Sequence, residues 1–332
     1  MVQNLSELRN KIFEIKSEAD FESAALSVFQ IQSELCKPYK EYLQLIGVNP
    51  ADVTHSAQIP SLPVSLFKNT RVICTEATPE HCFTSSTTTG ATPSVHYVAD
   101  LSLYRESFLR SFNLFLGSPE EYVILALLPS YLEREGSSLV YMVQELIKQS
   151  ADPLSGFYLY NHQQLKERLV TLAQRNKKTI LLGVSFALLD FAESCSISFP
   201  SLTVIETGGM KGRKTEIPRE QLHATLQQSF GVNRIGSEYG MTELLSQGWS
   251  LSNGIYNSPP WMKINIRDLG NPFKLIDNNK KGGINIIDLA NLYSCSFIET
   301  EDIGIKTAEN SFKVLGRINN SEIRGCNLLL EG

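Results

Sequence analysis

The first stretch of the sequence that could do chemistry is residues 83–93, where an unbroken run of hydroxyl side chains ends in a glycine and a proline follows. Hydroxyls and successive backbone N–H groups both donate hydrogen bonds to phosphate oxygens, and glycine lets the chain approach a ligand closely. A phosphate-binding loop is one interpretation, and a solvated turn is the other. A Walker loop is excluded, because no GxxxxGKS or GxxxxGKT motif is present.

Two later segments carry glycines, cations and a carboxylate directly after apolar runs. Residues 204–214 place Gly208 and Gly209 before Lys211 and two further cations, so a flat ligand could lie on bare backbone with positive charge nearby to balance phosphate. Residues 236–243 bring together an aromatic ring, a glycine, a hydroxyl and a carboxylate. Such a set can stack a base, contact phosphate and bind Mg²⁺, whereas the alternative is a surface turn with solvated charges.

These segments need a scaffold, and the apolar pattern predicts one. Short apolar runs typical of buried strands alternate with segments that are apolar at helical spacing. This alternation favours an α/β domain with a largely parallel sheet, in which ligands bind beyond the carboxyl ends of the strands. The predicted strands are residues 123–128, 179–184, 202–205, 232–235 and 284–289.

Ahead of that domain, the sequence predicts helices followed by an irregular segment. Apolar residues recur at the spacing of one helix face from Leu5 to Ile15, and Asp20 is predicted to cap a second helix, which Pro38 interrupts. Prolines then break any long element, so we predict an irregular strap over residues 47–72.

Composition and charge exclude several classes of protein. The 332 residues carry 30 Lys and Arg against 35 Asp and Glu, a net charge of −5, so nothing marks a surface for nucleic acid. No apolar stretch reaches the roughly 20 residues that a membrane crossing needs, and the amino terminus lacks the pattern of a signal peptide. The six cysteines form no CxxC pair and no zinc motif. We therefore expect a soluble, cytoplasmic protein with reduced thiols, no nucleic-acid partner and no membrane span.

The order of these segments resembles that of a known superfamily. SSTTTGATP, ETGGMKGR, SEYGMTE, EDIG, and LGR followed by RGC stand in the order found in the adenylate-forming, acyl-activating superfamily, and YGMTE is the most specific of them. The finer resemblance is to the LuxE-like acyl-protein synthetases, and it covers the chain from about residue 60 onward. It implies the large-domain fold of the adenylate-forming enzymes, which is α/β with mostly parallel sheets flanked by helices.

The resemblance also implies roles for individual residues toward two cofactors, ATP and Mg²⁺. The hydroxyl-rich loop would grip the triphosphate, although the family usually has glycine where Thr87 stands. The glycine pair and the tyrosine would frame the adenine, Thr242 would bond the α-phosphate, Glu243 would hold Mg²⁺, and Asp302 and Arg317 would fix the ribose. The residues implied to bind ATP or AMP are Ser85, Ser86, Thr87, Thr88, Thr89, Gly90, Gly208, Gly209, Tyr239, Gly240, Thr242, Asp302 and Arg317.

Two departures from the superfamily concern a positive charge and the acyl acceptor. Many members continue into a small lid domain with a catalytic lysine, and we expect that lid to be missing from this sequence, which ends at Gly332. Ser94 also stands where larger relatives often have lysine, so Lys211 is predicted to substitute in part as the phosphate cation. Cys326 is predicted to be the catalytic nucleophile that accepts the acyl group, as a cysteine near the carboxyl terminus does in LuxE-like proteins. The other five cysteines are predicted to be structural.

The predicted function is that of an ATP- and Mg²⁺-dependent ligase. It would convert a carboxylic acid, expected to be a fatty acid, into acyl-AMP and then into a thioester on Cys326, from which the acyl group would pass to a protein partner such as a reductase or an acyl carrier. The alternatives are a carboxylate–CoA ligase and a catalytically idle nucleotide-binding or scaffold protein. The predicted parts are a helical extension and strap at residues 1–72, an adenylate-forming α/β core at 73–316 and a tail at 317–332.

Overall fold

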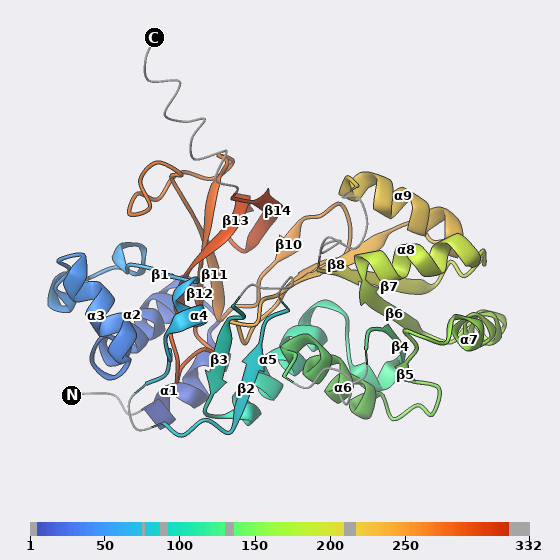
Figure 1. Cartoon of the computed structure of the whole chain (residues 1–332), viewed down its shortest axis with the longest axis horizontal. Helices are drawn as coiled ribbons and strands as arrows, with labels where there is room; N and C mark the ends of the chain where they lie inside the picture. Colours follow the sequence, from blue (N-terminus) through green and yellow to red (C-terminus); the bar gives the residue numbers. More distant parts are fainter. Residues whose placement is uncertain (1–4, 75–76, 87–91, 130–135, 209–216, 319–332) are drawn as a thin grey trace, which may run out of the picture.

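The computed structural model describes residues 5–74, 77–86, 92–129, 136–208 and 217–318. Figure 1 shows two halves joined by strands that run from one into the other: a parallel sheet with its helices in one half, and antiparallel strands with the amino-terminal helices in the other. The strands of the main sheet follow the order β11-β12-β13-β14-β10-β9-β8-β7-β6-β4-β5, and β1 pairs with β13.

The parallel half of the sheet confirms the predicted α/β fold. Strands β4 and β6 are buried throughout and largely apolar, which is the pattern expected where helices cover a parallel sheet on both faces. One strand differs from its prediction. β8 starts at Ile235, where the predicted apolar run ended, because this strand carries the buried polar residues Ser237 and Glu238. The parallel strands are β5 (Gly156–Phe157), β4 (Val123–Leu127), β6 (Thr179–Val184), β7 (Leu202–Thr207) and β8 (Ile235–Tyr239).

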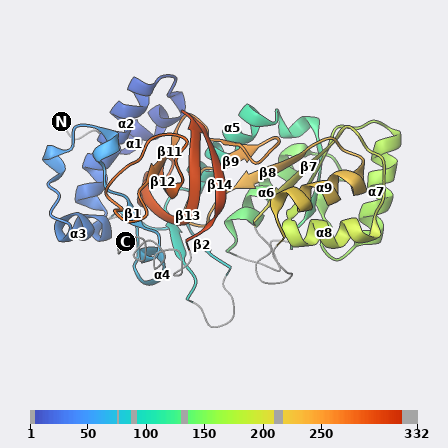
Figure 2. The same ribbon diagram turned by 90° about the horizontal axis from the view of Figure 1, so that it is seen from above.

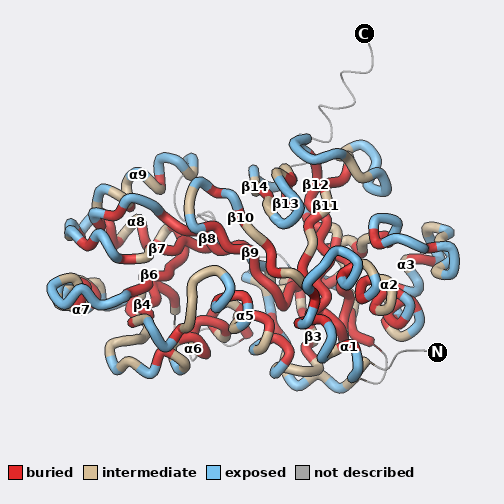
Figure 3. The backbone as a smooth tube through the Cα atoms, turned by 180° about the vertical axis from the view of Figure 1, so that it is seen from behind, coloured by how far each residue is buried: buried red, intermediate tan, exposed pale blue. Residues whose placement is uncertain are grey.

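Helices lie on both sides of these parallel strands. Figure 1 places α8 and α9 on one side and α5 and α6 on the other, and Figure 3 shows the buried strands between helices whose outer faces are exposed. The crossovers between parallel strands pass through helices, as parallel pairing requires. The helices of this half are α5 (Leu101–Phe115), α6 (Ser138–Ser150), α7 (His162–Gln174), α8 (Ser185–Ser194) and α9 (Arg219–Phe230), with a short 3-10 helix at Pro119–Glu121.

The other half of the sheet is antiparallel, because its strands follow one another through connections without helices. It forms the curved layer of long strands in Figure 2. The pairing of β13 with β14 places Asp302 opposite Arg317, so two residues implied to bind ribose share one register position. The antiparallel strands are β9 (Gly248–Ser250), β10 (Tyr256–Asn257), β11 (Met262–Arg267), β12 (Gly282–Asp288), β13 (Phe297–Ala308) and β14 (Ser311–Arg317).

The amino-terminal helices pack against the antiparallel half. Phe29 of α2 contacts Phe297 of β13 edge to face, with ring centroids 5.9 Å apart. The predicted cap of this helix is corrected: Ser17 is the N-cap, and Asp20 lies three residues later, where its carboxylate accepts the Ser17 N–H in a capping box. The elements of this segment are α1 (Leu5–Lys11), α2 (Glu18–Leu35), α3 (Lys37–Leu45), β1 (Leu62–Pro63) and α4 (Leu66–Asn69), with short 3-10 helices at Ile12–Glu14, Pro50–Asp52 and Ser56–Gln58.

A separate two-stranded hairpin leads into and out of the hydroxyl-rich segment. β2 (His81–Thr84) pairs antiparallel with β3 (Val95–Val98), so the predicted phosphate loop falls between these two strands in the sequence. Residues 87–91 of that loop lie outside the described ranges.

Two of the sequence predictions concern the chain as a whole. Among the helices that the structure describes, none has both the length and the apolar character needed to cross a bilayer. The predicted division of the chain at residues 72 and 316 stays a prediction.

Candidate active site

Two segments implied to bind a nucleotide leave the parallel sheet at the same edge. β7 and β8 pair in parallel with Thr207 opposite Glu238, so Gly208 and Tyr239 lie at neighbouring strand ends. Gly208 has a φ of +60°, a left-handed conformation that favours glycine, and its carbonyl accepts a hydrogen bond of 2.6 Å from the Ser185 hydroxyl. The exposed Gly208 backbone therefore stands at the strand edge where α/β sheets bind their ligands.

Tyr239, Asp302 and Arg317 form one polar group that joins the two halves of the sheet. The Tyr239 hydroxyl donates to Asp302 Oδ2 at 2.7 Å, and Arg317 Nε lies 3.6 Å from Asp302 Oδ1. Burial raises the pKa of Asp302, and the Tyr239 hydrogen bond and the Arg317 charge oppose this rise. The Arg317 side chain is 78% exposed, so its ion pair adds little stability and its guanidinium is accessible to a ligand. The fold thus brings together three residues that are far apart in the sequence.

Glu243 is joined to the base of the hydroxyl-rich loop. Its carboxylate is buried, and the nearby Ser94 hydroxyl favours the charged form. Ser94 and Ser85 close the base of the loop, because the Ser94 N–H donates to Ser85 Oγ at 2.9 Å and the Ser85 N–H donates to the Ser94 carbonyl at 3.0 Å. The loop expected to bind phosphate and the carboxylate expected to bind metal are therefore neighbours, and Ser86 is exposed at the start of the turn.

The surroundings of Glu243 fit a divalent cation that also binds phosphate. Burial raises the pKa of Glu243, while the Ser94 hydrogen bond and the positive charges of Arg317 and Lys68 oppose that rise. Mg²⁺ usually takes one or two protein carboxylates and completes its shell with water and substrate phosphates, so one carboxylate beside a phosphate loop suffices. Within the described residues, no group of three or more His, Cys, Asp or Glu side chains is arranged as a metal site of the protein alone.

The turn after β8, residues 240–246, is held by three buried side chains that the sequence analysis did not single out. His96 Nδ1 lies 2.9 Å from the Thr242 carbonyl oxygen, and the Asn291 amide donates to the Glu243 carbonyl at 2.8 Å. Asp288 accepts two backbone N–H groups of the same turn at 2.9 Å each. We call His96, Asp288 and Asn291 the turn clamp, because together they fix the backbone that presents Thr242 and Glu243.

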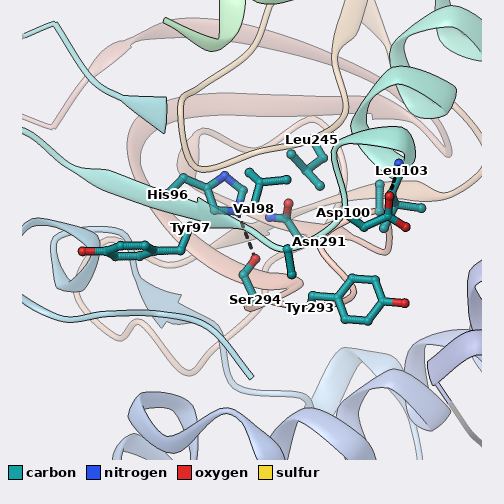
Figure 4. Close-up of a pocket in the computed structure, with 11 residues that line it drawn as sticks. His96, Tyr97, Val98, Asp100, Leu103, Leu245, Asn291, Tyr293 and Ser294 are labelled. Atoms are coloured by element: carbon teal, nitrogen blue, oxygen red, sulfur yellow. Dashed lines mark hydrogen bonds between the residues drawn. The ribbon is translucent and has the colours of Figure 1, made fainter. Parts of the chain in front are cut away.

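Figure 4 shows His96 and Asn291 of the turn clamp, which line a cavity too small for a substrate. The cavity measures about 10 Å³, which is room for about one water molecule. One dashed line in the figure joins His96 Nε2 to the Ser294 hydroxyl, 3.1 Å away. His96 occupies an inward-facing position of β3, where it alternates with half-buried neighbours, but no strand was predicted there from sequence.

His96 is neutral at physiological pH because it is fully buried. Burial lowers the pKa of His96 to about 4, against an opposing effect of the hydrogen bond to Thr242. The neutral ring donates from Nδ1 to the Thr242 carbonyl and accepts at Nε2 from Ser294. Because the unfolded chain keeps a histidine pKa near 6.5, acidification protonates the unfolded state first, so stability falls as the pH drops from about 6.5 toward 4.

We expect the wild-type protein to lose about 2 kcal/mol more free energy of unfolding between pH 7 and pH 5 than a His96→Gln variant does. Glutamine keeps a donor and an acceptor, but it takes up no proton in this range. Urea unfolding at the two pH values measures the difference, and His55→Gln, at a histidine whose side chain is 73% exposed, is the control. Equal losses in the wild type and in His96→Gln would contradict a neutral, buried histidine at this position.

Of the remaining predicted site residues, the structure describes only Gly240, and the others lie outside the described ranges. A side chain on Gly240 would meet the Glu238 carboxylate, which the Thr207 hydroxyl holds by a hydrogen bond, so a larger residue here would displace that carboxylate. The predicted site residues that lie outside the described ranges are Thr87, Thr88, Thr89, Gly90, Gly209, Lys211 and Cys326.

Comparison with known proteins identifies the fold as that of adenylate-forming ligases. No protein-family model and no curated protein sequence matches the chain. Among solved structures, however, the same arrangement of strands and helices occurs in acyl-CoA ligases of the adenylate-forming superfamily. These structures are 12–16% identical to the chain, so the comparison shows the fold alone.

Three of these structures illustrate the likeness. ATP-bound MatB from Rhodopseudomonas palustris is 14% identical, with a TM-score of 0.52 over 71% of this chain and 47% of that chain. An open conformation of 2-hydroxyisobutyryl-CoA ligase, in complex with 2-HIB-AMP and CoA, is 13% identical, with a TM-score of 0.61 over 92% of this chain and 72% of that chain. O-succinylbenzoate-CoA synthetase (MenE) from Bacillus subtilis, in complex with ATP and a magnesium ion, is 16% identical, with a TM-score of 0.52 over 73% of this chain and 50% of that chain. The chain thus spans about half the length of MatB and of MenE.

Proposed function

We propose that the chain activates a carboxylic acid with ATP, forming acyl-AMP and pyrophosphate. The observation that carries the proposal is the convergence of Tyr239, Asp302 and Arg317, with Tyr239 at the end of the strand that leads into the turn with Glu243. The base of the hydroxyl-rich loop adjoins that same turn through Ser94. The fold shared with ligases whose structures hold ATP, a magnesium ion or 2-HIB-AMP supports the same conclusion.

Each group is proposed to hold one part of the nucleotide. Asp302 and Arg317 hold the ribose, because a carboxylate accepts hydrogen bonds from hydroxyls and a guanidinium donates them. Tyr239 and the glycines at 208–209 frame the adenine, and Thr242 binds the α-phosphate where Gly240 lets the backbone approach. The proposed ligands of the outer phosphates are Ser85, Ser86, Thr87, Thr88, Thr89, Gly90 and Lys211.

The reaction brings two anions together, so the task of the chain is to hold them in line and to offset their charge. A carboxylate oxygen of the acid attacks the α-phosphorus, the bond from that phosphorus to the bridging oxygen breaks, and pyrophosphate leaves with the electron pair. Holding the reactants in line can contribute on the order of 7–11 kcal/mol of the barrier. Glu243 would hold Mg²⁺, which supplies positive charge to the phosphates when bound. A general base is not required, because a carboxylic acid is already ionised at neutral pH.

The second half-reaction is proposed to take place on Cys326. Its thiolate attacks the acyl carbonyl carbon of acyl-AMP, AMP leaves, and a thioester forms that can pass the acyl group to a reductase or an acyl carrier. The resemblance to LuxE-like proteins supports this step and supports a fatty acid as the substrate. A carboxylate–CoA ligase is the second proposal, because the fold is shared with a CoA ligase whose structure holds CoA. In that case the thiol of CoA takes the place of Cys326.

Labelled acids distinguish these functions. The purified chain is incubated with ATP, Mg²⁺ and a panel of radiolabelled fatty and aromatic acids, with and without CoA. We expect label on the protein that hydroxylamine removes, present in wild type and in Cys82→Ser but lost in Cys326→Ser. Cys82 is the matched control because it is an exposed cysteine of the described chain. Soluble acyl-CoA without labelled protein would favour the CoA ligase, and no product of either kind would contradict both enzyme functions.

A further inference from the structure

The strap pairs with β13 directly before α4 begins. β1 pairs in parallel with β13, with Leu62 opposite Ile298 and Pro63 opposite Glu299. The Val64 N–H donates to the Glu299 carbonyl at 2.9 Å, which extends this pairing by one residue. The chain then turns at residues 64–65, so α4 begins two residues beyond this pairing with β13.

A buried ring fixes α4 against the turn clamp. Phe67 is 1% exposed, and its ring meets the His96 ring edge to face with centroids 5.8 Å apart. His96 in turn contacts the Thr242 carbonyl, one residue before Glu243. The position of α4 is therefore set by the same histidine that sets the turn.

Lys68 follows Phe67 and has a different environment. Its side chain is exposed, and among the described residues its ammonium has no ion pair. The helix that carries it packs against β3, the strand that leaves the hydroxyl-rich loop. Ser94, directly before β3, closes the base of that loop, so Lys68 stands on the side of the site where the outer phosphates are proposed to lie.

We propose that Lys68 binds the β- and γ-phosphate oxygens of ATP and offsets the charge of pyrophosphate as it leaves. This inference rests on the nucleotide placement of the proposed function. Breaking the bond between the α-phosphorus and the bridging oxygen puts a further negative charge on pyrophosphate, and a lysine ammonium is a compact charge with three donors for it. The strap would thereby supply, from the amino-terminal side of the fold, a cation for the polyphosphate.

Binding of ATP and of AMP, measured by calorimetry with Mg²⁺ present, tests this role without requiring turnover. We expect ATP to bind about 10- to 100-fold more weakly to Lys68→Ala than to wild type, since a hydrogen bond to a charged group is lost. AMP, which lacks the outer phosphates, should bind both proteins equally. Lys68→Arg should restore most of the ATP affinity, and Lys40→Ala, at an exposed lysine of α3, should bind both nucleotides as wild type does.

The pattern across the two nucleotides decides the outcome. Unchanged ATP binding in Lys68→Ala would overturn the inference, and so would equal weakening of ATP and AMP, because that result indicates a structural role. A wild-type chain that binds neither nucleotide would overturn it together with the proposed function. A wild-type chain that binds ATP through Lys68 but shows no activity with any acid would contradict the proposed function and leave the role of Lys68 supported.

Discussion

Replacing Asp302 with alanine is expected to lower kcat/KM for ATP in pyrophosphate exchange by about 100- to 1000-fold. Hydrogen bonds to a charged group contribute about 1.5–3 kcal/mol each, and the proposed carboxylate accepts from two ribose hydroxyls. Water would not replace the lost hydrogen bonds, because Asp302 is a buried residue of β13 that contacts the Tyr239 hydroxyl. Removing the carboxylate also deprives the Tyr239 hydroxyl of its acceptor, so the tyrosine that would frame the adenine loses a positioning contact.

The matched control for Asp302 is Asp277→Ala, because the Asp277 side chain is 84% exposed in a connecting segment of the same half of the protein. This variant should retain wild-type activity. Tyr239→Phe keeps the Asp302 carboxylate and should lose only about 10-fold, the effect of one hydrogen bond. If Asp302→Ala stayed within about threefold of wild type while remaining folded, the ribose assignment would be wrong.

Glu243→Gln is expected to reduce the exchange rate by about 100- to 1000-fold and to weaken the dependence of that rate on Mg²⁺ concentration. A metal that neutralises phosphate charge is worth several kcal/mol of transition-state stabilisation, and an amide holds it poorly compared with a carboxylate. Glutamine keeps the shape of the side chain and an acceptor for Ser94. Because burial raises the pKa of Glu243, removing its charge should leave the thermal midpoint unchanged or raise it.

A rate titration with Mg²⁺ on wild type and Glu243→Gln measures this prediction. Glu145→Gln is the control, since Glu145 is also buried but lies on α6 and pairs with Lys148. The control should keep both the rate and the magnesium dependence of the wild type. Identical magnesium curves for wild type and Glu243→Gln would show that Glu243 does not hold the metal.

Strands β4, β6 and β7 were predictable from sequence because burial on both faces leaves a continuous apolar run. β4 and β6 are short apolar runs, and the pattern identified both. β8 was displaced in the prediction because it carries buried polar groups such as Ser237 and Glu238, which no hydrophobic pattern marks as strand. Most of the antiparallel strands were not predicted, for a related reason. Buried and half-buried residues alternate along them or the strands are very short, and the pairing that holds them is set by tertiary contacts.

Some site residues could be found from short sequence motifs, whereas others depend on tertiary contacts that the sequence does not reveal. Tyr239, Asp302 and Arg317 were predictable because each lies in a short motif that resembles a known superfamily, although only the fold showed that they meet. The turn clamp could not be found in this manner. His96 and Thr242 are 146 residues apart, and a buried histidine in a strand gives no hint of its partner. Lys68 lies in the part of the chain that the resemblance covers, but its position beside β3 depends on tertiary contacts such as that between Phe67 and His96.

The exchange of radiolabelled pyrophosphate into ATP by the wild-type chain, with and without added carboxylic acids, tests the central claim most directly. If the chain primes an acid on ATP, exchange will require Mg²⁺ and will appear only with acids that the chain accepts. Exchange that never rises above the acid-free background across fatty and aromatic acids, with ATP bound and the protein folded, would contradict the claim that this site makes acyl-AMP.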